Sequence, residues 1–217
     1  MARLLVFDLD GTLVDSSRDI ADAVNAALLR LAPGAPRLSL ERVMSFVGEG
    51  ARLLVERTLA DARIALDVDL VLRTYLECYR ERLLATTALY PGMGEALDAL
   101  ARGGTTLAVL TNKPGDMSRA ILDGLGVGPR FARILGAGDV AARKPDPAGL
   151  LALLGQLGVP ADEAWLVGDS ATDVNTARAA SVRVAGAAWG FDPAGLRAAG
   201  PDRLLAHPGE LTGLVTD

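Results

Sequence analysis

Two aspartates separated by one residue follow an apolar run near the start of the chain, in the segment Asp8-Leu9-Asp10-Gly11-Thr12-Leu13. A glycine directly after the second acid lets the backbone turn sharply, so both carboxylates can face one site. One carboxylate can attack phosphorus, while the other first protonates the leaving oxygen and then activates water. The pattern therefore predicts Asp8 as a nucleophile and Asp10 as an acid and base. The alternative is a solvated turn with two incidental acids.

A second apolar run, Val109-Leu110, is followed by Thr111, Asn112 and Lys113. A hydroxyl, an amide and an ammonium group at the end of a strand can bind phosphoryl oxygens. The amides of a helix beginning near Gly115 can add to such a site. Taken alone, the segment fits an ordinary strand-to-helix turn better.

A lysine lies between an arginine and a proline in the segment Arg143-Lys144-Pro145-Asp146-Pro147. The two prolines stiffen the segment, so the lysine is held in place and can neutralise charge on a nucleophile and a transferring phosphoryl group. Lys113 and Lys144 are the only lysines among 22 basic residues. A site that needs a compact, strongly hydrated point charge has reason to retain lysine. The alternative is a basic surface turn.

A second pair of acids, Asp169 and Asp173, follows the apolar run Trp165-Leu166-Val167. The spacing places one acid at the end of a strand and the other in the first turn of a helix. This arrangement suits one metal-ligating carboxylate and a second that supports it, and Mg²⁺ prefers oxygen ligands. The alternative is a helix cap together with an acid favoured by the helix dipole.

Apolar runs of strand length alternate with segments of helical period over most of the chain. Such a pattern predicts an α/β fold in which a parallel sheet has helices on each side. The expected strands are Leu4 to Leu9, Leu107 to Leu110, Ile134 to Leu135, Trp165 to Val167 and Val182 to Ala188. Because ligands bind at the carboxyl ends of parallel strands, the four polar segments are expected to meet at one edge.

Residues 16–86 break this alternation, because they contain helical segments and no strand signal. Ser16 or Ser17 is expected to cap the first helix, whose apolar face contains Ile20, Val24, Leu28 and Leu31. The expected later helices are Leu40 to Val47, Ala51 to Leu59 and Leu70 to Leu84. We therefore predict an all-helical insert that returns to the sheet near Tyr90-Pro91-Gly92.

Composition excludes several classes of protein. The net charge of −5 and the lack of long like-charge blocks argue against nucleic acid as a partner. The single histidine, His207, excludes a multi-histidine metal site, and the single cysteine, Cys78, excludes an internal disulfide. No stretch is long and apolar enough for a membrane span, and the N-terminal apolar run is too short for a signal peptide. These features predict a cytoplasmic protein.

These segments resemble the haloacid dehalogenase superfamily of phosphotransferases, and closely its phosphoglycolate phosphatases. The opening motif extends from Asp8 through Ser16. Thr111-Asn112-Lys113-Pro114, Lys144-Pro145-Asp146-Pro147 and Gly168-Asp169-Ser170 with Asp173 match the other three in order. Residues 16–86 occupy the position of the helical cap in such enzymes. The family often continues with Ala-Gly and a later Tyr-Gly pair, whereas this chain has Ala180-Ser181 and Trp189-Gly190.

The resemblance implies a Rossmann-like doubly wound core, residues 1–15 plus 87–217, and a mobile helical cap, residues 16–86. It implies that Thr111, Asn112 and Lys144 hold the phosphoryl group and that Mg²⁺ is the cofactor. The implied metal ligands are the Asp8 side chain, the Asp10 carbonyl and the Asp169 side chain, with Asp173 ligating directly or through water.

For substrate binding, the resemblance points to the cap loop Gly48, Glu49 and Gly50. Lys113 and Arg52 are further candidates, since a planar guanidinium can bind a substrate carboxylate. The expected partner is a small phosphorylated metabolite, and the expected assembly is a monomer or homodimer.

The resemblance implies hydrolysis of a phosphate monoester, first 2-phosphoglycolate, through an aspartyl-phosphate intermediate. Sugar-phosphate and amino-sugar-phosphate phosphatases, a pyrophosphatase and a phosphomutase stay open as alternatives. A catalytically inactive member that binds a phosphorylated ligand or a protein partner is the alternative from another class. True haloacid dehalogenases lack an acid at the position of Asp10, which separates this chain from them.

Overall fold

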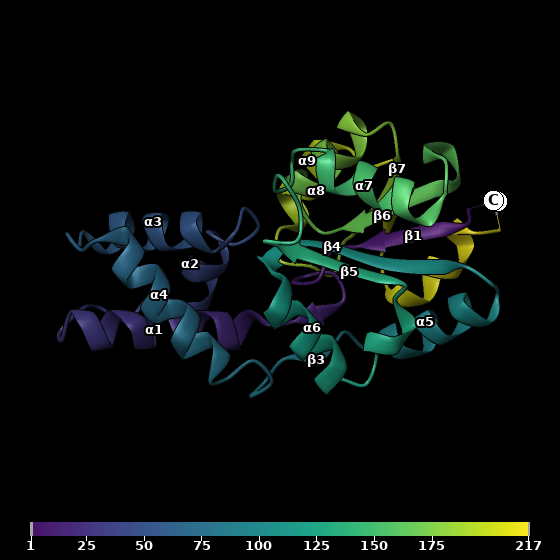
Figure 1. Cartoon of the computed structure of the whole chain (residues 1–217). Coiled ribbons are helices and arrows are strands. Elements are labelled where there is room, and N and C mark those ends of the chain that lie inside the picture. The colour runs from purple at the N-terminus through teal and green to yellow at the C-terminus, as the bar shows by residue number, and fades with distance from the viewer. Residues whose placement is uncertain (1, 217) are drawn as a thin grey trace.

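The computed structural model describes residues 2–216, and its centre is a parallel sheet of six strands (Figure 1). The order across the sheet is β5-β4-β1-β6-β7-β8. The strands are β1 Leu4–Phe7, β4 Thr106–Pro114, β5 Arg133–Ala137, β6 Ala164–Gly168, β7 Arg183–Ala187 and β8 Arg203–Leu205. In register, Phe7 of β1 lies between Val109 of β4 and Val167 of β6. The predicted α/β fold with a parallel sheet is confirmed.

Alternate side chains of the central strand enter two different apolar cores, as the two-residue period of a strand requires. Leu5 and Phe7 pack with α5 Met93–Arg102 and α6 Gly115–Gly124 on one face. Leu4 and Val6 pack on the other face, against α7 Ala148–Leu157, α8 Ala171–Ala179 and α9 Pro193–Ala199. Short 3₁₀ turns cover Gly128–Arg130, Ala161–Glu163 and Pro208–Leu214. The helices therefore bury both faces of the sheet (Figure 1).

Several elements differ from the sequence-based expectation. Strand β8 and helix α9 were not predicted, because each is only a few residues long and neither has a clear apolar period. Strand β4 continues through the polar residues after Leu110 as far as Pro114, because pairing with β5 resumes at Pro114 after an irregularity in the register. The strands and helices that were predicted are present, with their ends shifted by a few residues.

Four helices, α1 Ser17–Leu31, α2 Leu40–Met44, α3 Ala51–Ala62 and α4 Val68–Arg80, form a group beside the sheet (Figure 1). They enclose an apolar core of their own, and the predicted face of α1 contributes the buried Ile20, Val24 and Leu28. Met117 of α6 also belongs to this core. Because one sheet-side residue packs among the helices, the two parts of the chain are in direct contact.

Two extended segments join the helical group to the sheet. They pair as a short antiparallel ladder of β2 Val14–Asp15 and β3 Ala88–Leu89. Thr86 and Thr87 directly precede β3, and their amides and hydroxyls donate hydrogen bonds of 2.8 to 2.9 Å to the fully buried carboxylate of Asp19. Burial alone raises the pKa of Asp19, but these bonds outweigh it and hold the pKa below its ordinary value.

Ser16 precedes α1 as predicted, but its side chain does not cap the helix. Its hydroxyl instead donates to Oδ1 of Asp10 at 2.6 Å, because the carboxylate is the stronger acceptor. The expected cap is thus replaced by a contact to a predicted catalytic acid.

We expect Asp19→Ala to lower the free energy of unfolding by about 3 kcal/mol, because up to four donors lose their acceptor. Urea denaturation followed by circular dichroism measures this loss. Asp22 lies on the same helix but is about one-third exposed, so Asp22→Ala should cost less than about 1 kcal/mol. In the wild type, the contribution of Asp19 to the free energy of unfolding should be full at neutral pH and should be lost as the pH falls through its lowered pKa. Equal costs for the two variants would contradict the role of Asp19.

Candidate active site

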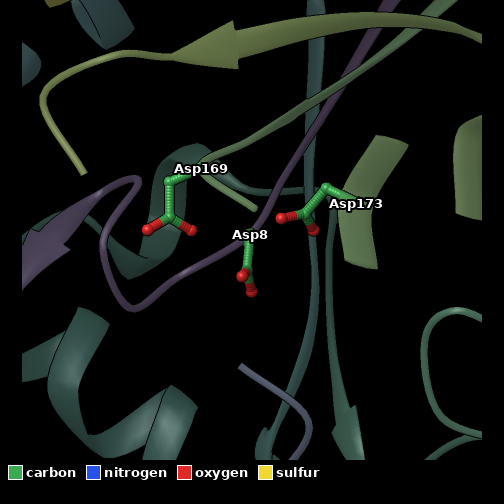
Figure 2. A group of neighbouring side chains, drawn as sticks. All are labelled: Asp8, Asp169 and Asp173. Atoms are coloured by element: carbon green, nitrogen blue, oxygen red, sulfur yellow. The ribbon is translucent and has the colours of Figure 1, made fainter. Parts of the chain in front are cut away.

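Asp8 directly follows the central strand β1, and its amide donates to the carbonyl of Val167 in β6 at 2.9 Å. Its side chain is buried and turns toward the carboxyl edge of the sheet (Figure 2). Asp10 follows two residues later and lines the same cavity as Asp8. The expectation that both acids address one site is met by the geometry.

Gly11 makes this arrangement possible. Its φ angle is 81°, in the left-handed region where glycine carries no steric cost. A Cβ atom at this position would also lie 2.1 Å from Oδ2 of Asp169. Glycine is therefore required both by the turn after the strand and by the close approach of the Asp169 carboxylate.

Lys144 lies at the centre of the acidic groups. Its ammonium group contacts Oδ1 of Asp8 at 2.9 Å and Oδ1 of Asp173 at 2.6 Å, and all three side chains are buried. Burial favours the neutral amine, but Asp173 and Asp8 outweigh it and hold the pKa of Lys144 above its ordinary value. Lys144 is therefore charged at neutral pH and is held against the predicted nucleophile.

Asn112 fixes the backbone of Lys144. Its Oδ1 accepts the Lys144 amide at 2.9 Å, and its Nδ2 donates to the Lys144 carbonyl at the same distance. Nδ2 also donates to the carbonyl of Gly48 at 3.1 Å. Both polar atoms of Asn112 are thus engaged with the protein, and one of its contacts reaches the loop between α2 and α3.

Asp8, Asp169 and Asp173 form a buried acidic cluster, with one carboxylate oxygen of each within 4.8 Å of the others (Figure 2). Burial, with repulsion from Asp173, raises the pKa of Asp8 to about 6 despite Lys144. Burial and then repulsion from Asp173 and Asp8 hold the pKa of Asp169 well above its ordinary value. At Asp8 and Asp169, burial and the mutual repulsion of the carboxylates therefore outweigh the nearby charge of Lys144.

The donor set of this cluster fits a hard divalent cation. Its groups are carboxylates, the ligands that Mg²⁺ prefers. Asp169 uses Oδ2 to accept the amide of Phe191 at 2.8 Å. Asp173 is more fully engaged, because Oδ1 receives Lys144 and Oδ2 receives the amide and hydroxyl of Ser170. This capping box orients Asp173 at the start of α8 and leaves Asp8 and Asp169 as the less engaged carboxylates.

Asp10 and Lys113 form a second ion pair beside the cluster. The Lys113 ammonium lies 2.8 and 2.9 Å from the two carboxylate oxygens of Asp10. It also donates to the hydroxyl of Tyr79, which belongs to α4 of the helical group. Both lysines of the chain are therefore buried at this edge of the sheet, as their rarity suggested.

A cavity lies between the sheet edge and the helical group. From the sheet side it is lined by Asp8, Asp10, Thr111, Asn112, Lys113 and Pro114. From the helical side it is lined by Ile20, Val47, Gly48, Gly50, Ala51, Leu54, Tyr75, Leu76 and Tyr79. The carboxyl ends of β1 and β4 thus supply the polar wall, and the helices supply an apolar and aromatic one.

Comparison with known proteins identifies the family. Residues 5–187 match the family model described as haloacid dehalogenase-like hydrolase. The chain belongs to this family. Because the family model matches such a large part of the chain, it confirms the resemblance drawn from the four motifs and the expectation of a hydrolase.

Named relatives of this hydrolase share most of its length. A phosphoglycolate phosphatase of Rhodospirillum rubrum is 44% identical, covering 88% of this chain and 81% of the relative. A phosphoglycolate phosphatase of Mesorhizobium japonicum is 35% identical, and the match covers 96% of this chain and 92% of the relative. The crystal structure of a predicted phosphoglycolate phosphatase from Haemophilus somnus superposes with a TM-score of 0.92 at 32% identity. The match covers 98% of this chain and 97% of that one. These relatives bear out the expectation of a phosphoric monoester hydrolase.

Two of the predicted substrate-binding residues, Glu49 and Arg52, do not line the cavity. Glu49 pairs with Arg57, and Arg52 pairs with Asp69 on the exposed side of the helical group. Neither Glu49 nor Arg52 lines the cavity, whereas the neighbouring Gly48 and Gly50 do. The loop therefore contributes backbone to the cavity, and the roles of the two charged side chains stay predictions.

Sequence reasoning missed Tyr75 and Tyr79, which line the cavity of the hydrolase from α4. Their rings stack at a centroid distance of 5.8 Å and an interplanar angle of 6°. The signal was the spacing of four residues between two aromatic side chains, which places them on one face of a helix. Only the packing of α4 against the sheet edge shows that this face borders the cavity.

Proposed function

We propose that this hydrolase is a Mg²⁺-dependent phosphatase that acts on a small phosphate monoester, first of all 2-phosphoglycolate, through an aspartyl phosphate on Asp8. The observation that carries the proposal is the position of the Asp8 carboxylate. It lies at the end of the central strand, lines the cavity and contacts the charged ammonium of Lys144 at 2.9 Å. A carboxylate held by a neighbouring cation in a cavity is suited to nucleophilic attack on phosphorus.

In the first step, an oxygen of Asp8 forms a bond to phosphorus and the bond to the ester oxygen breaks. Asp10 donates its proton to that leaving oxygen, which departs as an alcohol. In the second step, Asp10 takes a proton from water as the water oxygen attacks phosphorus, which releases phosphate and restores Asp8. Lys144 offsets the charge on the transferring group, and Thr111 supplies a hydroxyl from the cavity wall.

Mg²⁺ fits the acidic cluster on charge as well as on ligand type. The four carboxyl groups of Asp8, Asp10, Asp169 and Asp173 face two ammonium groups, so full ionisation leaves two negative charges. The proposed ligands are the side chains of Asp8 and Asp169 and the carbonyl of Asp10, with Asp173 in support. When bound, the cation neutralises charge on the phosphoryl oxygens.

The helical wall of the cavity favours a small substrate over a sugar. Among the described residues on that wall, the only polar side chains are those of Tyr75 and Tyr79. A sugar phosphate carries several hydroxyl groups, and burying them without partners costs free energy. A two-carbon acid has no such groups. The names of the relatives from Rhodospirillum rubrum and Mesorhizobium japonicum support phosphoglycolate as the first substrate.

We also propose that residues 16–86 act as a cap over the core, residues 1–15 plus 87–217. The contacts of Asn112 with Gly48 and of Lys113 with Tyr79 join the two parts across the cavity. Within residues 2–216, no helix is long and apolar enough to cross a membrane. A cytoplasmic location, a monomeric or homodimeric state and the lack of a nucleic-acid partner stay predictions.

A phosphate-release screen tests this function. We expect the purified protein with Mg²⁺ to show its highest kcat/KM for 2-phosphoglycolate, compared with hexose phosphates, an amino-sugar phosphate and pyrophosphate. Chelation with EDTA should abolish release, and excess Mg²⁺ should restore it. Preference for another ester would replace the substrate but retain the mechanism. Failure to release phosphate from any ester would favour a mutase or a binding protein.

A further inference from the structure

Lys113 is the only positively charged side chain among the described residues that line the cavity. It is only 7% exposed, so its charge is largely removed from bulk water. Lys144 does not line the cavity, and its ammonium is committed to Asp8 and Asp173 in the acidic cluster. A negatively charged group of the substrate other than its phosphoryl group would therefore meet Lys113 first.

The ammonium of Lys113 is held in place by the helical group. It donates to the hydroxyl of Tyr79 and lies 4.3 Å from the centre of the Tyr79 ring, within the range of a cation–π contact. Tyr79 in turn stacks on Tyr75 and is almost fully buried. The position of the charge is thus fixed before substrate binds, which reduces the cost of binding an anion.

The contact of Lys113 with Asp10 defines where that anion would lie. In the proposed reaction, Asp10 donates a proton to the ester oxygen, so that oxygen lies beside the Asp10 carboxylate. Lys113 is within 2.9 Å of both oxygens of the same carboxylate. A substrate group attached one carbon from the ester oxygen therefore lies next to Lys113. When Asp10 turns one oxygen toward the ester, at least one of the three donors of the ammonium becomes available.

We propose that Lys113, held by Tyr79, is a specificity-determining residue that binds the carboxylate of an α-phosphoryloxy carboxylic acid. This inference rests on the proposed phosphatase function. It moves the carboxylate contact from Arg52, which pairs with Asp69 outside the cavity, to the motif that follows β4. It also gives the helical group a role in choosing the substrate through a tyrosine.

The test compares kcat/KM for 2-phosphoglycolate with that for 2-hydroxyethyl phosphate, in which a neutral hydroxymethyl group replaces the carboxylate. Wild-type protein should prefer the carboxylate. Lys113→Met also disturbs Asp10, so both values should fall, but the value for phosphoglycolate should fall about 100-fold further. Tyr79→Phe keeps the ring and loses the hydroxyl, so the preference should fall about tenfold. Lys113→Arg retains the charge and should recover part of the preference.

Equal losses for both esters in Lys113→Met would overturn the inference, because Lys113 would then act only through Asp10. Loss of the preference in Arg52→Met, with Lys113→Met retaining it, would place the carboxylate contact at Arg52 instead. If Lys113→Met fails to fold, an unchanged preference in Tyr79→Phe overturns the inference. Wild-type protein that shows no preference for phosphoglycolate contradicts the proposed substrate itself, whereas a preference that survives in the variants contradicts only the role of Lys113.

Discussion

Asp8→Asn should abolish phosphate release, with kcat at least about 10⁴-fold lower than in the wild type. The amide cannot form the bond to phosphorus, and no other carboxylate in the described cavity occupies the same place beside Lys144. Steady-state phosphate release with saturating Mg²⁺ measures the effect. Asp98→Asn, on the exposed surface of α5, is the matched control and should retain activity. Unchanged turnover in Asp8→Asn would refute the assignment of the nucleophile.

The same variant has a predicted effect on stability that separates chemistry from folding. The pKa of Asp8 is raised from 3.8 to about 6, so the folded protein binds the proton more tightly than the unfolded chain. Its contribution to stability is therefore full below about pH 4 and is lost as the pH rises through 6, at a cost of up to roughly 3 kcal/mol. In EDTA above pH 6, Asp8→Asn should unfold at the same or a higher temperature than the wild type. A large drop in Tm would instead indicate a structural defect.

Lys144→Met should lower both turnover and stability. The change leaves the carboxylates of Asp8 and Asp173 buried without their cation, and breaking a buried ion pair in this way costs about 3 to 5 kcal/mol. Turnover should fall at least about 10³-fold, because the charge that faces the nucleophile and the phosphoryl group is lost. Urea denaturation and phosphate release, each with and without Mg²⁺, measure the two effects. Mg²⁺ should restore part of the stability, since it neutralises the same carboxylates.

Two further variants test whether the positive charge at position 144 must be carried by a lysine. Lys144→Arg keeps the charge, but its guanidinium is larger and planar, and it must fit a buried place that holds a compact ammonium between two carboxylates. It should therefore remain strongly impaired. Arg143→Met, at the exposed neighbouring position, should have little effect. Full activity in Lys144→Arg would show that charge alone is sufficient there.

Much of the site was predictable from local sequence because of where its residues stand relative to the strands. Asp8, Thr111 and Asp169 each follow an apolar run, and parallel strands bring such positions to one edge of a sheet. Lys144 was identified by its type, since lysine is rare in this chain. Gly11 was identified by the turn that must follow the strand, and the close approach of Asp169 gave it a second reason.

Other parts of the site depend on contacts between residues far apart in the chain. Lys113 contacts Tyr79, which is 34 residues away in the sequence, and Asp10, which is 103 residues away. The loop after α2 showed no feature that would separate Gly48 and Gly50, which line the cavity, from Glu49, which does not. The hydroxyl of Ser16 had two acceptable partners, and only the position of Asp10 decided between them.

The sequence by itself determined the α/β fold, the family and the acids and lysines of the proposed reaction, because apolar periodicity and residue type act locally. The tertiary structure alone decided which residues of the helical group line the cavity. The reason is physical: a helical period shows which side chains share a face, but not which face packs against another element. In this protein that packing placed Tyr79 beside Lys113 and left Arg52 outside the cavity.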